Sequence, residues 1–446
     1  LLISKYDDPS ALKEDGGFAL LKAMQKGNLE IVQLLSKDVE IPKYTPTESS
    51  PPPLCCACYG QNNEIIKWML ARDDYDRDET NSSGQTALAW ACKEGNLEIV
   101  NLLIDGGCSL GNCLVFACRS GNVELIKFLL DKNADINLPD GSTPLQVLCR
   151  KDDVQLFLPL VKLLLSRDDL EINRRDSNGH TALTTACYTG NIEAVKLLLA
   201  RDDVDIQAKN KWGKDPLRYA CKGPYLEIAK LLIDRGADVN APNDKGSNAF
   251  HIVCKSKKYV EFVKYMLATK KLDINAQGKN GYTGLHLSLN KEDTEIIKLL
   301  LARKDLDVNA KNNYGNTVAH LSLCQRNRRN LEALKLVLAK DDFDITAKNN
   351  LGKTLLHLAV GAPEFAEIVK LLLARDSIDI NDADNDGNTV LHCMSYDKTE
   401  IVKLFLAMEN LDINAQNKEG NTGFHRCCER NNVEKVKLML SRDDLD

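Results

Sequence analysis

Hydrophobic positions along this chain fall into paired helical patterns that are separated by short polar turns. In residues 179–205, Thr181 precedes a first apolar run, Gly190 follows it, and Asn191 precedes a second apolar run at residues 192–199. Threonine and asparagine are favoured N-caps, and glycine readily adopts the left-handed conformation that ends many helices. This stretch therefore predicts two consecutive helices, capped by Thr181 and Asn191, with Gly190 between them.

The same pattern recurs along the whole sequence. From Gly141 onward the turn glycines follow one another at intervals of roughly 33 to 38 residues. The turn glycines are Gly84, Gly141, Gly179, Gly213, Gly246, Gly281, Gly315, Gly352, Gly387 and Gly420. No single repeat has enough apolar surface to fold alone, so stacking of neighbours must supply the core. We expect an all-α solenoid of about thirteen helix–turn–helix units.

The regularity of the repeat varies along the chain and suggests three stretches. Residues 1–80 predict divergent repeats, and residues 81–140 predict repeats with one shortened hairpin near Gly111. Residues 141–446 predict a regular array. Because the first residues resemble the tail of a repeat and the last ones stop where a hairpin would begin, we expect both ends to be truncated.

Two short motifs relate these repeats to a known family. The first is a Gly-x-Thr-Pro-Leu-His run, seen at residues 141–145, 352–357 and 387–392. The second is a loop similar to Asp-Val-Asn-Ala, seen at residues 238–241, 273–276, 307–310 and 412–415. Over almost its whole length the chain resembles the ankyrin-repeat family, and its Arg-Asp-Asp-Leu loops look like a variant common in protist ankyrin proteins. The resemblance implies helix pairs joined by short β-hairpin-like loops, with a concave surface that binds proteins.

Composition narrows the classes of partner and location. A net charge of -6 argues against nucleic acid as the main partner, because phosphate binding needs a concentrated basic face. No apolar run approaches the length of a membrane-spanning helix. Eight of the fifteen cysteines share one small, buried helix register, which indicates packing in a reducing compartment. These are Cys58, Cys92, Cys118, Cys149, Cys187, Cys221, Cys254 and Cys428. We expect a cytoplasmic protein, with association to the cytoskeleton left open.

Candidate chemistry is repetitive rather than unique. Six histidines occupy the family's Leu-His position: His251, His286, His320, His357, His392 and His425. Stacked helices lie about 8–10 Å apart, too far for successive histidines to share one ion. In the family this histidine forms hydrogen bonds between neighbouring turns. The C-x-x-C at residues 55–58 lacks a second pair, and Trp68 and Trp90 fall at helix-core registers. We therefore expect no catalytic site, no cofactor and no metal.

The resemblance also indicates where a partner would bind. In the family, partner contacts come from residues that flank the turn glycine and from the end of the first helix. Here these positions hold His180, Tyr188, Lys211, Trp212, Lys214, Tyr282 and Tyr314. Exposed aromatic side chains beside lysines suit interface anchors, although the aromatic rings could instead pack against adjacent hairpins.

We expect a non-enzymatic scaffold or adaptor for a protein or peptide, either monomeric or part of a larger assembly. The alternative is the ankyrin segment of a larger sensor, channel or signalling enzyme whose activity lies outside these residues. An enzyme within the chain is the third hypothesis, and a pocket of convergent, non-repeating polar groups would support it.

Overall fold

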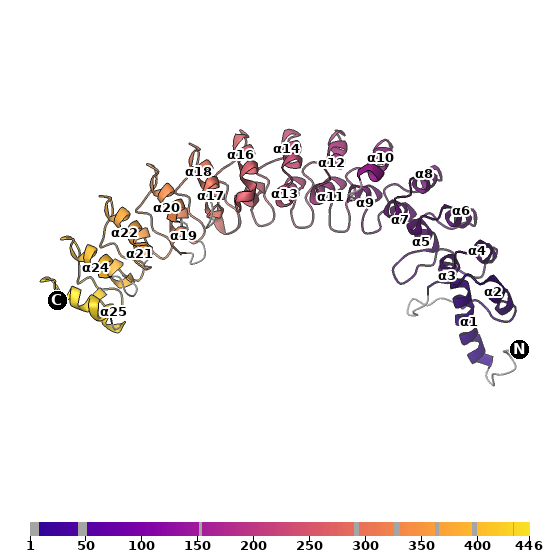
Figure 1. Ribbon diagram of the computed structural model, residues 1–446, viewed down its shortest axis with the longest axis horizontal. Helices are drawn as coiled ribbons and strands as arrows, with labels where there is room; N and C mark the ends of the chain where they lie inside the picture. Colours follow the sequence, from indigo (N-terminus) through magenta and orange to yellow (C-terminus); the bar gives the residue numbers. More distant parts are fainter. Residues whose placement is uncertain are drawn as a thin grey trace. The chain divides into compact units, whose positions relative to one another are not determined.

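Consecutive helices of this protein form antiparallel pairs that stack side by side (Figure 1). The structure is a computed structural model that describes residues 9–42, 51–150, 154–289, 294–324, 331–361, 365–394, 399–430 and 432–446. The helices α1 to α26 make thirteen successive pairs in these residues, which confirms the predicted all-α solenoid. The chain divides into two units, Leu1–Lys211 and Trp212–Asp446.

In the first unit, six pairs stack in chain order. The first helices of the pairs are α1 (Pro9–Gln25), α3 (Pro53–Tyr59), α5 (Ala87–Glu94), α7 (Cys113–Ser120), α9 (Pro144–Arg150) and α11 (Ala182–Thr189). The second helices are α2 (Leu29–Leu35), α4 (Asn63–Leu70), α6 (Leu97–Asp105), α8 (Val123–Asp131), α10 (Val154–Leu165) and α12 (Ile192–Leu199). The connection at residues 106–112 is short, so α7 follows α6 without the long hairpin seen in later layers.

In the second unit, seven pairs stack in the same way. The first helices are α13 (Pro216–Lys222), α15 (Ala249–Val253), α17 (Gly284–Leu287), α19 (Val318–Cys324), α21 (Leu355–Ala359), α23 (Val390–Cys393) and α25 (Gly423–Glu429). The second helices are α14 (Leu226–Asp234), α16 (Val260–Ala268), α18 (Glu295–Leu301), α20 (Leu331–Leu338), α22 (Ala366–Leu373), α24 (Thr399–Leu406) and α26 (Val433–Met439). Two 3₁₀ turns, η2 (Lys257–Tyr259) and η3 (Lys279–Gly281), complete the unit's described helical segments.

The predicted caps form as expected in the pair α11–α12. The Thr181 hydroxyl accepts a hydrogen bond from the backbone N–H of Thr184, and the Thr184 hydroxyl accepts one from Thr181 N–H. Gly190 ends α11 in the left-handed conformation with φ of 80°, where a side chain would be strained. The Asn191 side chain then accepts from Ala194 N–H at 3.1 Å and begins α12. Local chemistry therefore determines the boundaries of both helices.

The first helices carry most of the core. In α11, the six residues from Ala182 to Cys187 are all buried, and α11 packs against α12 of its own pair and against α9 of the previous pair. The second helices are amphipathic, so α12 buries Ala194, Val195, Leu198 and Leu199 and leaves Lys196 exposed. A fully buried leucine contributes about 2 kcal/mol, and in this pair Leu183 and Leu198 are at most 1% exposed.

An asparagine in each of seven loops fastens one layer to the next. The Asn309 side chain donates to the Asp342 carbonyl and accepts from Asp344 N–H, both at 2.7 Å. Equivalent pairs of bonds are made by Asn137, Asn173, Asn240, Asn275, Asn381 and Asn414. We call these residues the asparagine ladder. Because both ends of the amide are used, each asparagine fixes the distance and register between two layers.

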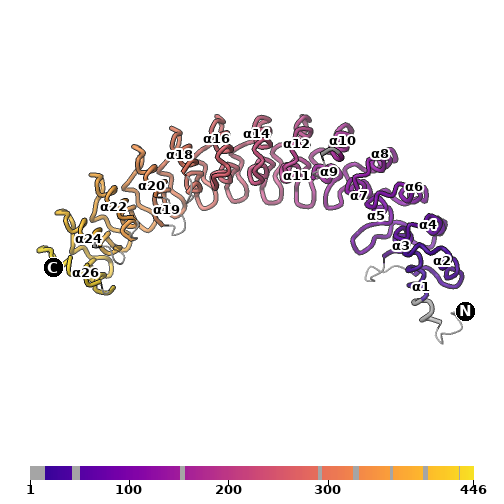
Figure 2. The backbone as a smooth tube through the Cα atoms, viewed as in Figure 1, coloured from indigo at the N-terminus to yellow at the C-terminus, as the bar shows by residue number. Residues whose placement is uncertain are grey.

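The loops that join one helix pair to the next fold into tight hairpins. Figure 2 draws these hairpins as parallel bends of the tube within each unit. In the described residues these hairpins form no β-sheet and contain two isolated β-bridges, Asp140 with Ser142 and Gln416 with Thr422. The expected β-hairpin-like loops are therefore tight turns that end in a left-handed glycine, such as Gly315 with φ of 72°.

Candidate functional site

The hairpin tips of the second unit are held together by backbone hydrogen bonds. Asn313 N–H donates to the Asn280 carbonyl at 3.0 Å, and Asn350 N–H donates to the Tyr314 carbonyl at 3.1 Å. Further along, Asn385 N–H donates to the Leu351 carbonyl at 3.0 Å. Since consecutive tips are bonded through their main chains, the residue before each turn glycine has a fixed position. We call this row of tips the tip ladder.

Large apolar side chains stand on these tips. Trp212, Tyr314 and Leu351 each directly precede a turn glycine, and they are 50%, 56% and 62% exposed. Exposed apolar side chains on a rigid backbone lose little entropy when a partner covers them, so they suit interface anchors. Tyr314 and Leu351 lie on adjacent tips, because the carbonyl of Tyr314 bonds to the residue before Leu351.

Lys214 lies between two aromatic rings at the first tip of the unit. Its ammonium nitrogen is 5.9 Å from the centroid of Trp212 and 5.8 Å from that of Tyr219. Burial lowers the pKa of Lys214, and repulsion from Lys222 and Arg218 lowers it further. Cation–π contacts of this kind orient both partners, so Trp212 is presented next to a positive charge.

Tyr282 is placed differently from the other aromatic residues of the candidate set. It follows its turn glycine, is only partly exposed, and packs edge-on against His286 with ring centroids 5.7 Å apart. Its carbonyl also bonds to the His251 ring nitrogen Nε2 at 3.0 Å. Much of Tyr282 therefore serves packing between layers, the alternative that its sequence position left open.

The remaining candidates belong to the first unit. His180 is part of its turn, with Nδ1 at 3.2 Å from the Asp176 carboxylate and Nε2 at 3.0 Å from the Asn210 side chain. Tyr188 at the end of α11 is 63% exposed, and Lys211 is also exposed. The unit boundary falls between Lys211 and Trp212, so these three residues and the four of the second unit are described as separate groups.

Five buried histidines of the second unit form a column, one per layer: His251, His286, His320, His357 and His392. Each lies with Nε2 at 2.8–3.1 Å from a backbone carbonyl in the next turn. At the other ring nitrogen, each Nδ1 accepts from the backbone N–H of its helix N-cap residue. A carbonyl only accepts and a backbone N–H only donates, so each ring is neutral with its proton on Nε2. The predicted bond between neighbouring turns is confirmed for these five of the six histidines, and it is Nε2 that donates.

Burial lowers the pKa of all five of these histidines, and hydrogen bonds to backbone carbonyls only partly oppose this effect. For His320 the pKa falls to about 4. Both nitrogens of each ring are already used by the fold. Among the residues placed by the structure, no three or more His, Cys, Asp or Glu side chains are grouped so as to hold a metal ion.

Comparison with protein-family models gives matches along most of the chain. The model described as ankyrin repeats (3 copies) matches residues 20–112, 114–210, 157–243, 201–277, 250–349 and 323–416. A second model, ankyrin repeats (many copies), matches residues 393–440. The chain belongs to the ankyrin-repeat family. No curated protein matched it in the corresponding search.

Ankyrin repeats are in general protein–protein interaction modules and are generally non-enzymatic. In this ankyrin array, no described helix has both the length and the apolar character needed to cross a bilayer. The turn-glycine tips and the ends of the first helices are the positions that the family resemblance indicated for partner contacts, so they are the surfaces to consider for a partner.

The thiols of the array lie where packing needs a small side chain. Seven of the eight cysteines predicted to be buried are buried, and Cys428 is exposed. This part of the prediction was wrong because no helix among the described residues covers that side of α25; Cys427 is buried there instead. Burial raises the pKa of Cys55 and Cys56 to about 12, so neither thiol of the C-x-x-C is a ready thiolate.

The repeated Arg-Asp-Asp loops of the ankyrin layers are also structural. The Arg201 guanidinium forms two bonds to the Asp203 carboxylate, at 2.9 and 2.7 Å, and a third to the Leu165 carbonyl in the previous layer. The arginine hydrogen bond and charge hold the pKa of Asp203 below its usual value. The guanidinium therefore caps a helix end and keeps the carboxylate ionised, which explains the pattern without acid–base catalysis.

Three residues that are exposed at least in part were not predicted from the sequence. Leu351 has the same position before a turn glycine as Trp212 and Tyr314, and that register could have identified it. Trp90 was expected in the core, but it is only partly buried and lines an open hollow with Tyr59. Its exposure depends on the neighbouring layer, which leaves one face of the ring uncovered. Tyr59 ends α3 as Tyr188 ends α11, so the rule that selected Tyr188 would also have selected it.

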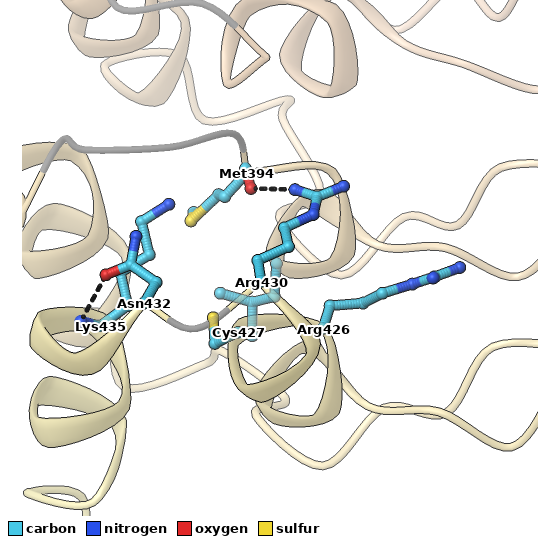
Figure 3. Close-up of a pocket in the computed structure, with 7 residues that line it drawn as sticks. Met394, Arg426, Cys427, Arg430, Asn432 and Lys435 are labelled. Atoms are coloured by element: carbon cyan, nitrogen blue, oxygen red, sulfur yellow. Dashed lines mark hydrogen bonds between the residues drawn. The ribbon is translucent and has the colours of Figure 1, made fainter.

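A small cavity lies in the last two layers of the ankyrin array (Figure 3). Its volume is about 10 Å³, and its lining includes Met394, Cys427, Arg430 and Lys435. Arg430 donates to the Met394 carbonyl at 2.7 Å across it. A cavity of this size holds one water at most, so it is not a ligand site.

Proposed function

We propose that this ankyrin array is a non-enzymatic scaffold or adaptor that binds a partner protein or an extended peptide on its hairpin tips and first helices. In the second unit the proposed contacts are Trp212, Lys214, Tyr282 and Tyr314, with Leu351 added by its exposure. In the first unit the proposed contacts are His180, Tyr188 and Lys211.

The observation that carries this proposal is the tip ladder. It holds two large apolar side chains, Tyr314 and Leu351, more than half exposed on a hydrogen-bonded backbone, and Trp212 is 50% exposed before the first turn glycine of the same unit. The turns themselves depend on glycine conformation and main-chain bonds, so the exposed part of each side chain is available to a partner. Side chains of this kind are typical of interface anchors, each of which contributes about 2 kcal/mol or more to binding.

We also propose a reducing compartment, the cytoplasm, as its location, and a monomer or a component of a larger assembly as its state. The support is the use of thiols as packing groups: seven cysteines at one helix register are fully enclosed by neighbouring layers. Such free buried thiols are typical of reducing compartments.

The test is affinity capture from the source cell with the full chain and a triple variant, Trp212→Ala, Tyr314→Ala and Leu351→Ala. We expect this variant to retain at least tenfold less of the partners that the wild-type chain retains. Its midpoint temperature of thermal unfolding should stay within about 2 °C of the wild-type value.

The matched control replaces three exposed apolar residues on or beside second helices of the same unit: Leu371, Val433 and Leu440. It removes a similar apolar area without touching the tips, so it should retain the same partners. Equal retention by the tip variant and the wild-type chain would refute the proposed contacts.

A further inference from the structure

An aromatic pair lies on the first helices of the first unit. Tyr59 at the end of α3 and Trp90 in α5 meet edge to face, with ring centroids 4.7 Å apart and planes at 60°. The Tyr59 hydroxyl accepts a hydrogen bond from the Asn81 side chain at 3.2 Å, which fixes the ring. Both rings are only partly buried, so one face of the pair is open to solvent.

The open face is the floor of a hollow of about 500 Å³. Its other lining residues are Lys22 and Gln25 of α1 and Lys26, which directly follows α1 (Figure 1 labels α1, α3 and α5). Both lysines are exposed, and none of the described residues that line the hollow is a carboxylate. An aromatic surface beside two positive charges is therefore available to solvent at this place.

The surroundings of the hollow have the same chemical character. Tyr59 occupies the last position of its first helix, directly after the buried Cys58. The equivalent positions in the next layers of the unit are basic or aromatic: Lys93, Arg119, Arg150 and Tyr188. Of these, Arg119 is paired with Asp140 at 2.8 Å. A partner that lies along the first-helix ends would thus meet positive charges and rings, with the hollow at one end.

We propose that this hollow binds an acidic segment of a partner protein, with one apolar side chain against the ring of Trp90 and carboxylates near Lys22 and Lys26. Charge complementarity favours a negatively charged partner segment, because lysine ammonium groups attract anions and disfavour cations. The aromatic pair favours a segment with an apolar side chain, since apolar contact with an open tryptophan face contributes most to the binding free energy.

An acidic protein segment fits better than a nucleic acid. Stable phosphate binding uses many cationic contacts at once, whereas two lysines line this hollow and the chain carries a net charge of -6. The site uses none of the tip residues of the second unit, so this proposal can be tested independently of the contacts proposed there.

The experiment measures binding of a fluorescein-labelled peptide to the full chain by fluorescence anisotropy. The probe has one phenylalanine with four glutamates on either side, and a second probe has glutamine in place of every glutamate. We expect the acidic peptide to bind at least tenfold more tightly than the glutamine peptide, with an affinity that falls as salt rises.

Two variants locate the binding. The double variant Lys22→Glu and Lys26→Glu should weaken acidic-peptide binding at least tenfold, and Trp90→Leu should weaken it at least fivefold. Because Lys22 and Lys26 are exposed, the double variant keeps the thermal unfolding of the wild-type chain and remains decisive even if Trp90→Leu is less stable.

The controls make the same changes elsewhere in the unit. Lys127→Glu with Lys162→Glu alters the same net charge at exposed positions of the second helices α8 and α10, and Trp68→Leu removes a partly exposed tryptophan of α4. All three substitutions should change the dissociation constant less than twofold.

Three results would overturn the proposal. The first is equal affinity of the acidic peptide for the wild-type chain and the Lys22→Glu, Lys26→Glu variant, or no binding to either. The second is tighter binding of a nine-nucleotide oligo(dT) than of the peptide, lost in the same variant, which would assign the hollow to nucleic acid. The third is self-association abolished by that variant, which would assign it to a second copy of the chain.

Discussion

Acidification should destabilise the second unit through its column of five histidines, and His320 gives the magnitude. Burial lowers the pKa of His320 from 6.5 to about 4, so the folded ring stays neutral while the ring in the unfolded chain takes up a proton. This contribution is zero above about pH 6.5, grows as the pH falls, and stops growing below about pH 4. At about 1.4 kcal/mol per pKa unit, His320 alone costs about 3 kcal/mol of stability at the lower end.

Another layer of the chain already has a non-titrating residue at the position equivalent to His320. Gln146 occupies the equivalent position in the first unit, where its Oε1 accepts from Thr143 N–H at 2.9 Å and its Nε2 donates to the His180 carbonyl. His320→Gln can therefore keep both bonds that the ring makes to Thr317 and Lys353. The variant should match the wild-type chain near neutral pH and lose about 2–3 kcal/mol less on going to about pH 4.5.

The assay is urea unfolding at about pH 7.5 and pH 4.5, combined with hydrogen exchange of peptides from α19 and α21 to locate the effect. His425→Gln serves as the control, because His425 is exposed and its Nε2 bonds to no turn carbonyl among the described residues. An equal loss of stability in the wild-type chain and in His320→Gln would refute the proposed difference in proton uptake.

Three further outcomes follow from the layer contacts. Gly315→Ala should lower the free energy of unfolding in urea titrations more than Gly420→Ala does. Both glycines have positive φ, but an added Cβ at Gly315 would lie 2.5 Å from a backbone nitrogen of the next turn, whereas nothing lies within 4 Å of one at Gly420. Asn309→Ala removes two bonds of the asparagine ladder and should cost about 1–3 kcal/mol by the same assay; no change would show that the ladder adds no stability. In the native chain a thiol reagent should label Cys324 and Cys428 first, since both are exposed, and mass spectrometry that found a buried thiol equally fast would contradict the packing.

The features that sequence analysis predicted best depend on local chemistry. The caps at Thr181 and Asn191 and the left-handed Gly190 involve residues three positions apart or fewer, and the structure places them as expected. The helix pairs were predictable because their apolar spacing is repeated in every layer. The histidine bonds came from the family resemblance, and the structure adds which ring nitrogen donates.

What could not be predicted depends on the adjacent layer. Cys428 matches the buried cysteine register, yet it is exposed because no described helix covers the far side of α25. Trp90 matches a core register, yet the layers beside it leave a hollow over its ring. A repeat pattern defines each position relative to its own unit, whereas exposure is a property of two or three units together.

The tip ladder separates what holds the turns from what they display. Its hydrogen bonds join main-chain atoms, as between Asn350 and Tyr314, and the side chain before each glycine contributes nothing to them. A substitution at such a position can therefore alter what the surface recognises while leaving the scaffold intact. Over evolutionary time an array built in this way can acquire a new binding specificity one layer at a time.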